Sequence, residues 1–438
     1  MNAATKDSGV KWIGTVPADW EINKIKYIAS LKGRIGWQGL TSEEYTDEGA
    51  YLITGVDFKD GGIDWESCEH IPMHRWEEAR DIQIENGDLL ITKDGTIGKV
   101  AIVDGCTEPT SLNSGVLRIS TIDGYDRRFL YWVLQSDVFW EWFADANAGN
   151  STIQHLYQGD FAEFKYAIPQ VDEQKAIANY LDVECAKLDE IIATVESQIA
   201  VLTKYRSTLI REATTKGLRP NTASKQSKVP AIGDIPEEWM IYRVKDVAKL
   251  SSGSTPDRAN IQYWDGDICW VKTGELQNDY LYDTEEKITA QAFRDSSLSM
   301  LQKGTILMAM YGQGKTRGMT AMLKMQSTTN QACAAIAVKK EFDPDYIWYA
   351  IMGSYESIRE EAQGSGQPNL SLDIVKNFKI AAPPIEEQKE IAAYLSKRKP
   401  IIDDMLAREK SALSKVKEQK KALIYEYVTG KKRIKGVN

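Results

Sequence analysis

The sequence predicts an α/β (α+β) chain that is built twice, with two globular domains and two long helices that pair as an antiparallel coiled coil. Three observations support this fold class: a collinear internal repeat, short β-type runs within each copy, and aliphatic residues at seven-residue spacing after each copy. The chain has 438 residues, of which 42% are hydrophobic and 27% are charged. At ~100–200 residues per domain, this length accommodates about two to four domains.

The internal repeat is visible in matching motifs that keep their order. IGTVPADW at 13–20 returns as IGDIPEEW at 232–239, and VDEQKAIANYL at 171–181 returns as IEEQKEIAAYL at 385–395. Between them, GDLLIT from Gly87 corresponds to GTILMA from Gly304, and Asn113 corresponds to Asn330. The offset drifts by only a few residues, as expected if insertions lie in surface loops. We therefore expect a pseudo-twofold repeat.

Each copy begins with a globular part of mixed content, residues 13–168 and 232–382. The β-like runs are YLITGV, GDLLIT, VAIV and VLRIS in the first copy and ICWVKT, TILMAM and CAAIAV in the second. They lie between turns rich in Gly, Asp and Asn, which is typical of short strands. An aromatic-rich stretch in each copy, 127–144 and 345–361, is predicted to be helical.

Each copy ends in a predicted long helix, residues 169–216 and 383–432, and a polar linker at 217–231 follows the first. Prolines precede both helices, and acidic residues occupy both first turns, where the helix dipole favours them. The predicted coiled-coil positions are Leu181, Leu188, Val195, Leu202, Leu209, Leu395, Ile402, Val416 and Leu423. Antiparallel pairing of the two helices would bury both rows of aliphatic residues and place the two domains at opposite ends of the coiled coil. The alternative is two amphipathic helices, each lying on its own domain.

Charge and composition restrict the function classes. The formal net charge is −9, although the segment from Arg408 onward is basic. An acidic body argues against an indiscriminate nucleic-acid binder, so any DNA contact must come from local patches. The five cysteines are far apart, which predicts reduced thiols. No run is long and apolar enough for a membrane span and no apolar signal core is found, so we expect a cytoplasmic protein without membrane contact.

The motifs that would indicate catalysis are incomplete. Gly314-Lys315-Thr316 resembles the end of a phosphate loop, but Ala309 occupies the position of its first glycine. Pro256-Asp257 with Glu285-Glu286-Lys287 loosely resembles a nuclease pattern, and Cys68, His70 and His74 have no fourth ligand at a recognisable spacing. The pattern favours a reader or adaptor with no catalytic residues and no metal site.

Loops in equivalent positions of the two copies carry glycines beside basic and hydrogen-bonding residues, which suits contacts with bases and phosphates. The candidate DNA-binding residues are Arg34, Gln38, Lys93, Thr96, Lys99, Asn150, Ser151, Gln154, Thr255, Lys272, Gln313, Lys315, Thr316, Arg317, Gln367 and Asn369. A solvated turn is the alternative for each of them. Because the loops occupy equivalent positions but differ in sequence, we expect the two copies to recognise different DNA targets with similar backbones.

The whole chain resembles the DNA-specificity (S) subunit of type I restriction–modification systems. The resemblance lies in the two IGxxPxxW segments, in VDEQKAIANYLD and IEEQKEIAAYLS, and in the helix ends LIREATTKG and LIYEYVTGK. It spans about residues 13–432, and the ending of the first copy departs mildly from the family pattern.

The resemblance implies that each globular part is a target recognition domain that reads one half of a split, asymmetric double-stranded DNA target. It implies that the coiled coil sets the spacing and that the chain docks two modification methyltransferase subunits and, through them, restriction/translocase subunits. S-adenosylmethionine, ATP and Mg²⁺ would then belong to those partners, with no cofactor bound by this chain. The alternatives are an S-like subunit of another restriction architecture, a non-catalytic coiled-coil scaffold and an autonomous nuclease.

Overall fold

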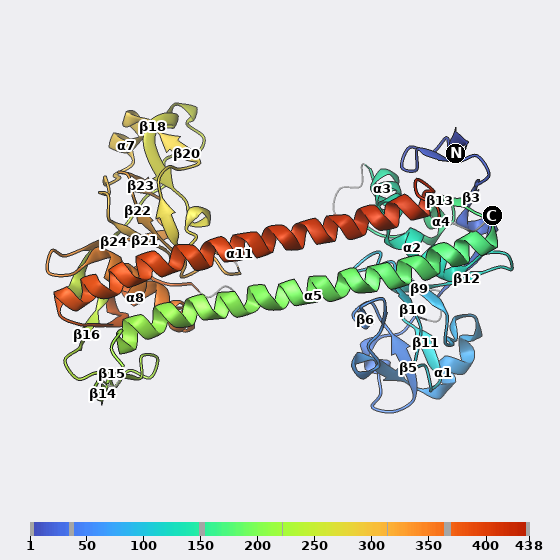
Figure 1. Cartoon of the computed structure of the whole chain (residues 1–438), viewed down its shortest axis with the longest axis horizontal. Coiled ribbons are helices and arrows are strands. Elements are labelled where there is room, and N and C mark those ends of the chain that lie inside the picture. The colour runs from blue at the N-terminus through green and yellow to red at the C-terminus, as the bar shows by residue number, and fades with distance from the viewer. Residues whose placement is uncertain are drawn as a thin grey trace. The chain divides into compact units, whose positions relative to one another are not determined.

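The computed structural model describes residues 4–34, 39–148, 154–220, 222–312, 314–362 and 369–434. The chain forms two compact units, residues 1–196 with 411–438 and residues 197–410. Each unit contains one globular part and a portion of both long helices, α5 (Val171–Lys216) and α11 (Ile385–Val428) (Figure 1). The units therefore cut across the segments predicted from the sequence, because both helices pass from one unit into the other.

The first unit is built from short strands in several small sheets. A four-stranded antiparallel sheet has the order β10-β9-β12-β4, and a three-stranded mixed sheet has the order β11-β5-β8. Two-stranded sheets β1-β2, β6-β7 and β13-β3 complete it. The strands are β1 (Thr5–Asp7), β2 (Thr15–Pro17), β3 (Glu21–Lys24), β4 (Ala29–Gly33), β5 (Ala50–Ile53), β6 (Phe58–Lys59), β7 (Gly62–Ile63), β8 (Glu69–Ile71), β9 (Leu89–Thr92), β10 (Val100–Ile102), β11 (Thr110–Leu112), β12 (Val116–Thr121) and β13 (Lys165–Ile168).

The second unit repeats this arrangement. Its larger sheet has the order β17-β24-β21-β22-β19, its three-stranded sheet the order β20-β18-β23, and its two-stranded sheets are β14-β15 and β16-β25. The strands are β14 (Ser224–Gln226), β15 (Asp234–Pro236), β16 (Met240–Arg243), β17 (Ala248–Ser252), β18 (Trp264–Val271), β19 (Asp279–Leu281), β20 (Glu286–Ile288), β21 (Ile306–Ala309), β22 (Thr320–Leu323), β23 (Thr328–Thr329), β24 (Cys333–Val338) and β25 (Lys379–Ala382). The fifth strand of the larger sheet, β19, pairs parallel to β22.

The two sheet systems correspond in their main strands, apart from the β6-β7 pair of the first unit and β19 of the second, so the internal repeat extends to the tertiary structure. The neighbours β4, β12, β9 and β10 match β17, β24, β21 and β22, and the parallel pair β5–β11 matches β18–β23. The β-like runs predicted from the sequence coincide with strands in both copies. The mixed α/β fold class predicted from the sequence is confirmed.

Short helices cover the sheets, and each aromatic-rich stretch forms two helices where one was predicted. The short helices are α1 (Met73–Glu78), α2 (Arg127–Gln135), α3 (Asp137–Ala146), α4 (Gln158–Phe161), α6 (Val244–Val247), α7 (Ala290–Asp295), α8 (Pro344–Gly353), α9 (Tyr355–Glu360) and α10 (Leu372–Asn377). A serine ends the first helix of each pair. Ser136 Oγ donates to the Val133 carbonyl and Ser354 Oγ to the Ala350 carbonyl, which competes with helix continuation.

The repeated Glu-Gln pair fastens the first turn of each long helix to its globular part. Gln174 is buried, accepts from the Asp126 backbone N–H at 2.7 Å and donates to the Pro169 carbonyl at 2.8 Å. Gln388 makes the same two bonds with Asp343 at 3.0 Å and Pro383 at 2.8 Å. Since both aspartates are the N-caps of their helices, α2 and α8, the amide joins two helix starts.

The preceding glutamate binds a buried tryptophan in each copy. Trp20 Nε1 donates to Glu173 at 3.1 Å, and Trp239 Nε1 donates to Glu387 at 3.3 Å. These tryptophans come from the IGxxPxxW segments and are almost fully buried. The two motifs that mark the repeat in the sequence therefore meet in space in each copy.

The long helices run antiparallel within each unit. In the first unit, the Tyr180 and Tyr427 rings lie 4.6 Å apart, and Lys420 and Lys417 pair with Asp189 and Glu196. In the second unit, Arg206 pairs with Asp403 at 2.6 Å and Arg219 with Glu390 at 3.5 Å. Residue numbers rise along α5 as they fall along α11. The predicted pairing is thus confirmed, and the alternative of two separate helices is wrong.

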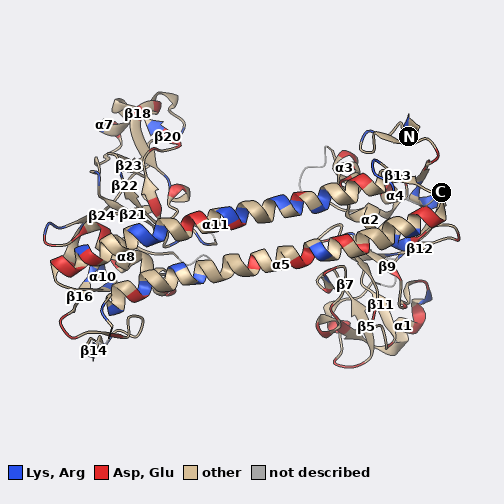
Figure 2. Ribbon diagram, viewed as in Figure 1, with Lys and Arg blue, Asp and Glu red and all other residues tan. Residues whose placement is uncertain are grey.

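The predicted coiled-coil positions lie on the less exposed side of both helices. Leu181, Leu395 and Ile402 are buried, and Leu188, Val195, Leu202, Leu209, Val416 and Leu423 are half-buried. Acidic residues lie mostly in the first half of α5 and basic residues mostly in its second half, and both kinds occur along α11 (Figure 2). Part of the basic charge of the C-terminal segment is neutralised by carboxylates of α5, as the Lys417 and Lys420 pairs show.

Pro400 lies inside α11, and the helix continues through it. A proline in a helix interior lacks the N–H that would bond to the carbonyl four residues earlier. Pro400 is on an exposed position, where water can satisfy the released carbonyl. No helix among the described residues is long and apolar enough to cross a membrane.

We predict that Gln174→Leu destabilises the first unit, because it leaves the Asp126 N–H and the Pro169 carbonyl without their partner. The free energy of unfolding should fall by about 2–4 kcal/mol, measured by urea denaturation followed by tryptophan fluorescence. Lys175→Leu, at the exposed neighbouring position, should change it by less than about 0.5 kcal/mol. Equal effects of the two substitutions would show that the hydrogen bonds of the Gln174 amide do not stabilise the attachment of α5.

Candidate nucleic-acid interface

In the first copy, the hairpin loop 93–99 between β9 and β10 is tied down by Thr92. Its hydroxyl accepts from the Lys99 backbone N–H at 3.0 Å and donates to the Thr96 carbonyl. Gly98 has φ of +78°, and a Cβ there would lie 2.5 Å from the Trp140 ring. The turn therefore needs glycine at this position, and it leaves the Thr96 and Lys99 side chains exposed.

The predicted segment before α4 and the loop after β5 both meet this loop. The Leu156 N–H donates to the Lys93 carbonyl at 3.0 Å, and His155 Nδ1 lies 2.7 Å from Asp94 Oδ1, so the chain that precedes α4 lies against the hairpin. Lys99 Nζ lies 3.3 Å from the Gly55 carbonyl on the loop after β5. Lys93, Thr96, Lys99 and the exposed Gln154 thus belong to one loop cluster, as an interface requires.

The second copy presents the equivalent loop, 310–319 between β21 and β22, on the same frame. The Leu370 N–H donates to the Met310 carbonyl at 2.9 Å, which repeats the contact of Leu156 with Lys93 and brings Asn369 next to the loop. Arg359 from α9 donates to the Arg317 carbonyl at 2.6 Å and to the Gly314 carbonyl at 2.9 Å. This clamp by Arg359 holds the backbone at Gly314 and Arg317, while Lys315 stays exposed and Thr316 and Arg317 are half-buried.

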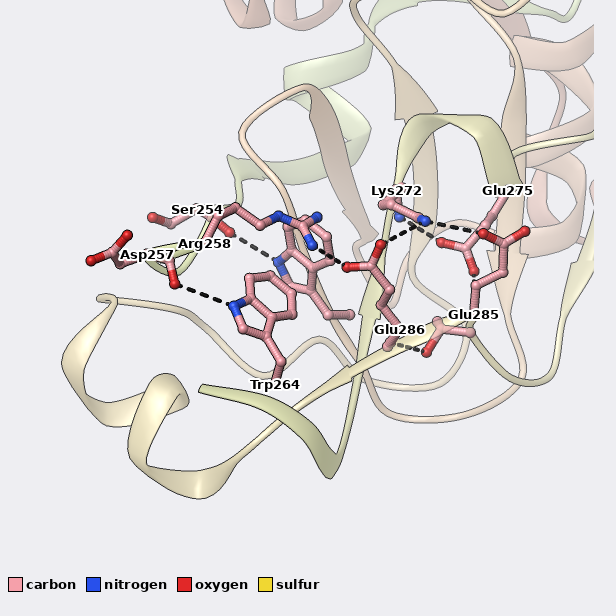
Figure 3. Close-up of polar contacts among 10 residues, drawn as sticks. Ser254, Asp257, Arg258, Trp264, Lys272, Glu275, Glu285 and Glu286 are labelled. Atoms are coloured by element: carbon pink, nitrogen blue, oxygen red, sulfur yellow. Dashed lines mark hydrogen bonds and ion pairs between the residues drawn. The ribbon is translucent and has the colours of Figure 1, made fainter. Parts of the chain in front are cut away.

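A second polar cluster in this copy lies around a pocket of about 490 Å³ (Figure 3). Lys272 Nζ bonds to Glu285 at 3.0 Å and to Glu286 at 2.8 Å, and Arg258 bonds to Glu286 at 2.5 Å. These hydrogen bonds raise the pKa of Lys272 and lower that of Glu286, so both stay charged. Thr255 and Asn330 also line the pocket.

Several of the predicted contact residues are placed differently by the structure. Arg34 is 5% exposed, and its guanidinium donates to the Leu112 carbonyl and to Ser111 Oγ. Burial lowers the pKa of Arg34 to about 10. The prediction that Arg34 contacts DNA is therefore wrong, because its polar atoms hold β11 in place. Gln38, Asn150, Ser151, Gln313 and Gln367 lie outside the described residues.

The nuclease pattern does not assemble as the sequence suggested. Lys287 pairs with Asp283 at 3.0 Å, and Asp257 accepts from the Ala259 N–H. Within the described ranges, no group of three or more histidine, cysteine or acidic residues could hold a metal ion. The His70 ring instead packs against the Tyr51 ring with their centres 4.6 Å apart, and Cys68 is buried.

Sequence reasoning missed Arg258, Trp264 and the clamp residue Arg359. Arg258 directly follows the Pro256-Asp257 pair that was considered only as nuclease chemistry. The sequence did offer a signal for this cluster, because Arg258 is followed closely by Trp264 and Trp270. Arg359 had no such signal, because it reaches a loop more than forty residues earlier in the chain.

Comparison with known proteins identifies the family. The type I restriction modification DNA specificity domain matches residues 17–201 and 236–413, once in each copy and over most of the chain. The chain belongs to this family. The resemblance inferred from the repeated motifs is thereby confirmed.

Two relatives match over nearly the whole length of both proteins. The chain is 24% identical to the type I restriction enzyme MjaVIII specificity subunit of Methanocaldococcus jannaschii, over 97% of this chain and 95% of that protein. It is 22% identical to the EcoKI specificity subunit of Escherichia coli, over 95% and 90%. A solved chain from a study of complex assembly and conformational transition in the type I R-M system has a TM-score of 0.66 at 14% identity, covering 94% and 98%. That structure shares the fold of these specificity domains.

We predict that Lys315→Ala weakens DNA binding without affecting folding, because its side chain is exposed and forms no ion pair with a carboxylate of the described residues. Loss of one phosphate contact should reduce the slope of log affinity against log salt by about 1. Gel-shift titrations of the assembled complex at several salt concentrations measure this. Lys340→Ala, an exposed lysine between β24 and α8, is the matched control and should leave the slope unchanged.

Proposed function

We propose that this chain is the sequence-specific DNA-recognition subunit of a type I restriction–modification complex, in which each globular domain reads one half of a bipartite, asymmetric target. The supporting observation is that the two domains share the same backbone arrangement but carry hairpin loops of different sequence. Both copies attach the segment before the long helix to the same hairpin by an equivalent backbone bond, while the hairpins read KDGTIGK and QGKTRG. Side chains on loops can change the bases read without changing the frame.

We propose that the paired helices set the spacing between the two half-sites. Support comes from the continuity of α5 over Val171–Lys216 and of α11 over Ile385–Val428. Helices of this length rise by roughly 65 Å. In readers with two recognition elements, the half-site spacing follows the geometry of the protein.

We further propose that two modification methyltransferase subunits, and restriction/translocase subunits through them, dock on this chain. In this proposal the partners supply S-adenosylmethionine, ATP and Mg²⁺ chemistry, and this chain supplies recognition without catalysis. The negative net charge of −9 supports the division, because partners would then contribute much of the phosphate neutralisation. An S-like subunit of another architecture, in which modification and cleavage share one polypeptide, would differ in its partners only.

We predict that exchanging residues 232–382 for the corresponding domain of another family member changes one half-site and leaves the other intact. The reason is that each domain carries its own hairpin and its own preceding segment bonded to that hairpin. Genome-wide methylation mapping of a host with and without the exchanged chain measures the target. A change in both half-sites would contradict independent domains, and methylation that does not depend on the chain would favour a scaffold.

We predict that inserting one heptad into both helices lengthens the spacer and preserves both half-sites. The insertions belong near residue 199 of α5 and residue 410 of α11, positions bracketed by the pairs Glu196–Lys417 and Arg206–Asp403. Seven residues add about 10 Å, or about three base pairs of duplex. Methylation mapping gives the new spacer. The control is an insertion into one helix only, which shifts the seam and should abolish methylation; an unchanged spacer in the double insertion would contradict a ruler.

A further inference from the structure

Arg258 is held in a fixed orientation by two tryptophans and a carboxylate. Its guanidinium carbon lies 4.0 Å from the Trp264 ring centre and 4.9 Å from that of Trp270, and its Nη1 bonds to Glu286. Figure 3 shows Arg258 beside Trp264, with its guanidinium bonded to Glu286. Trp264 and Trp270 are nearly perpendicular to each other, so their rings and the Glu286 carboxylate confine the guanidinium from three sides.

The loop that carries Arg258 is pinned on both sides by the same tryptophans. Trp270 Nε1 donates to the Ser254 carbonyl at 3.0 Å, and Trp264 Nε1 donates to the Asp257 carbonyl at 3.2 Å. Trp270 is 1% exposed and belongs to a small core with Ile288 and Ala292. Arg258 therefore stands on a rigid base, although its side chain is 52% exposed.

The remaining donors of this arginine are available to a ligand. Among the described residues, Glu286 engages Nη1, and no partner occupies Nε or Nη2. A guanidinium offers five N–H donors in a planar fork, and guanine is the base that presents two acceptors, O6 and N7, in the major groove. A preorganised fork loses little side-chain entropy when it forms such a bidentate pair.

The charges around Arg258 disfavour a phosphate as the ligand. Glu275, Glu285 and Glu286 line or adjoin the pocket, and the basic residues among its described lining are Arg258 and Lys272. Lys272 is already shared between two of these carboxylates. A phosphate placed here would meet more negative than positive charge, whereas the neutral edge of a base pair would not.

We propose that Arg258 reads a guanine in the half-site bound by the second domain, with Glu286 and Trp264 as positioning residues. This inference rests on the proposed function, since it requires that the second domain bind DNA. Lys272, which the sequence suggested only as a DNA-binding candidate, has a different part in this proposal. Lys272 becomes the bridge that keeps Glu285 and Glu286 together.

Methylation mapping of the assembled complex tests this assignment. Arg258→Ala and Arg258→Lys should relax one guanine position in one half-site, with about a 5- to 150-fold loss of discrimination there, and leave the other half-site intact. Arg258→Lys keeps the charge and the stem, so it decides the outcome if Arg258→Ala fails to assemble. Arg294→Ala, an exposed arginine on α7, is the matched control and should keep the wild-type target.

A binding cycle identifies the contacted atom. Replacing the target guanine by 7-deazaguanine removes the N7 acceptor, so the affinity of the wild-type complex should fall about 5-fold or more, and that of the Arg258→Ala complex should not fall further. Glu286→Gln should give an intermediate loss at the same position, because the fork is then oriented by the tryptophans alone. Equal weakening on all sequences, or an unchanged target with Arg258→Lys, would overturn the assignment. Absence of methylation with the wild-type chain would instead overturn the proposed function.

Discussion

The attachment of each long helix to a buried tryptophan is the constraint on which the rest of the structure depends. Glu173 receives the Trp20 indole N–H, and Gln174 beside it joins the start of α5 to the N-cap of α2. The same arrangement recurs at Trp239 and Gln388. Polar side chains buried in this way are costly without their partners, so they fix one orientation of the helix on its domain.

Each of these tryptophans also packs against the C-terminal end of the second long helix in its unit. Gly430 follows α11 and packs on Pro17 and Trp20, so closely that a Cβ would lie 2.4 Å from the proline ring. Gly217 follows α5 and packs on Trp239. Both glycines have positive φ, which suits a helix C-terminus. Within each unit, the start of one helix and the end of the other are therefore held at one point, and this fixes the antiparallel register.

This register explains how a recognition protein can vary its target while keeping its architecture. The contacts that hold the long helices in place involve the hydrophobic cores, the helix ends and the interface between the two helices. The hairpin loops and the Arg258 pocket lie instead in segments between strands. The clamp from Arg359 and the indole bonds beside Arg258 order those segments locally. Changes in loop content therefore cost little stability elsewhere, which is the physical basis for exchanging specificity.

The sequence by itself determined the duplication, the strand-rich domains and the two helices, because motif order, alternation and heptad spacing are local patterns. It also located the hairpin loops around Lys99 and Lys315. Only the tertiary structure decided that Arg34 is buried on Ser111 and that Lys272 is occupied by two carboxylates. Only it brought Arg258 onto Trp264 and Trp270 and Arg359 onto the loop at Gly314. The availability of a charged side chain depends on partners distant in the chain, and no local pattern encodes those contacts.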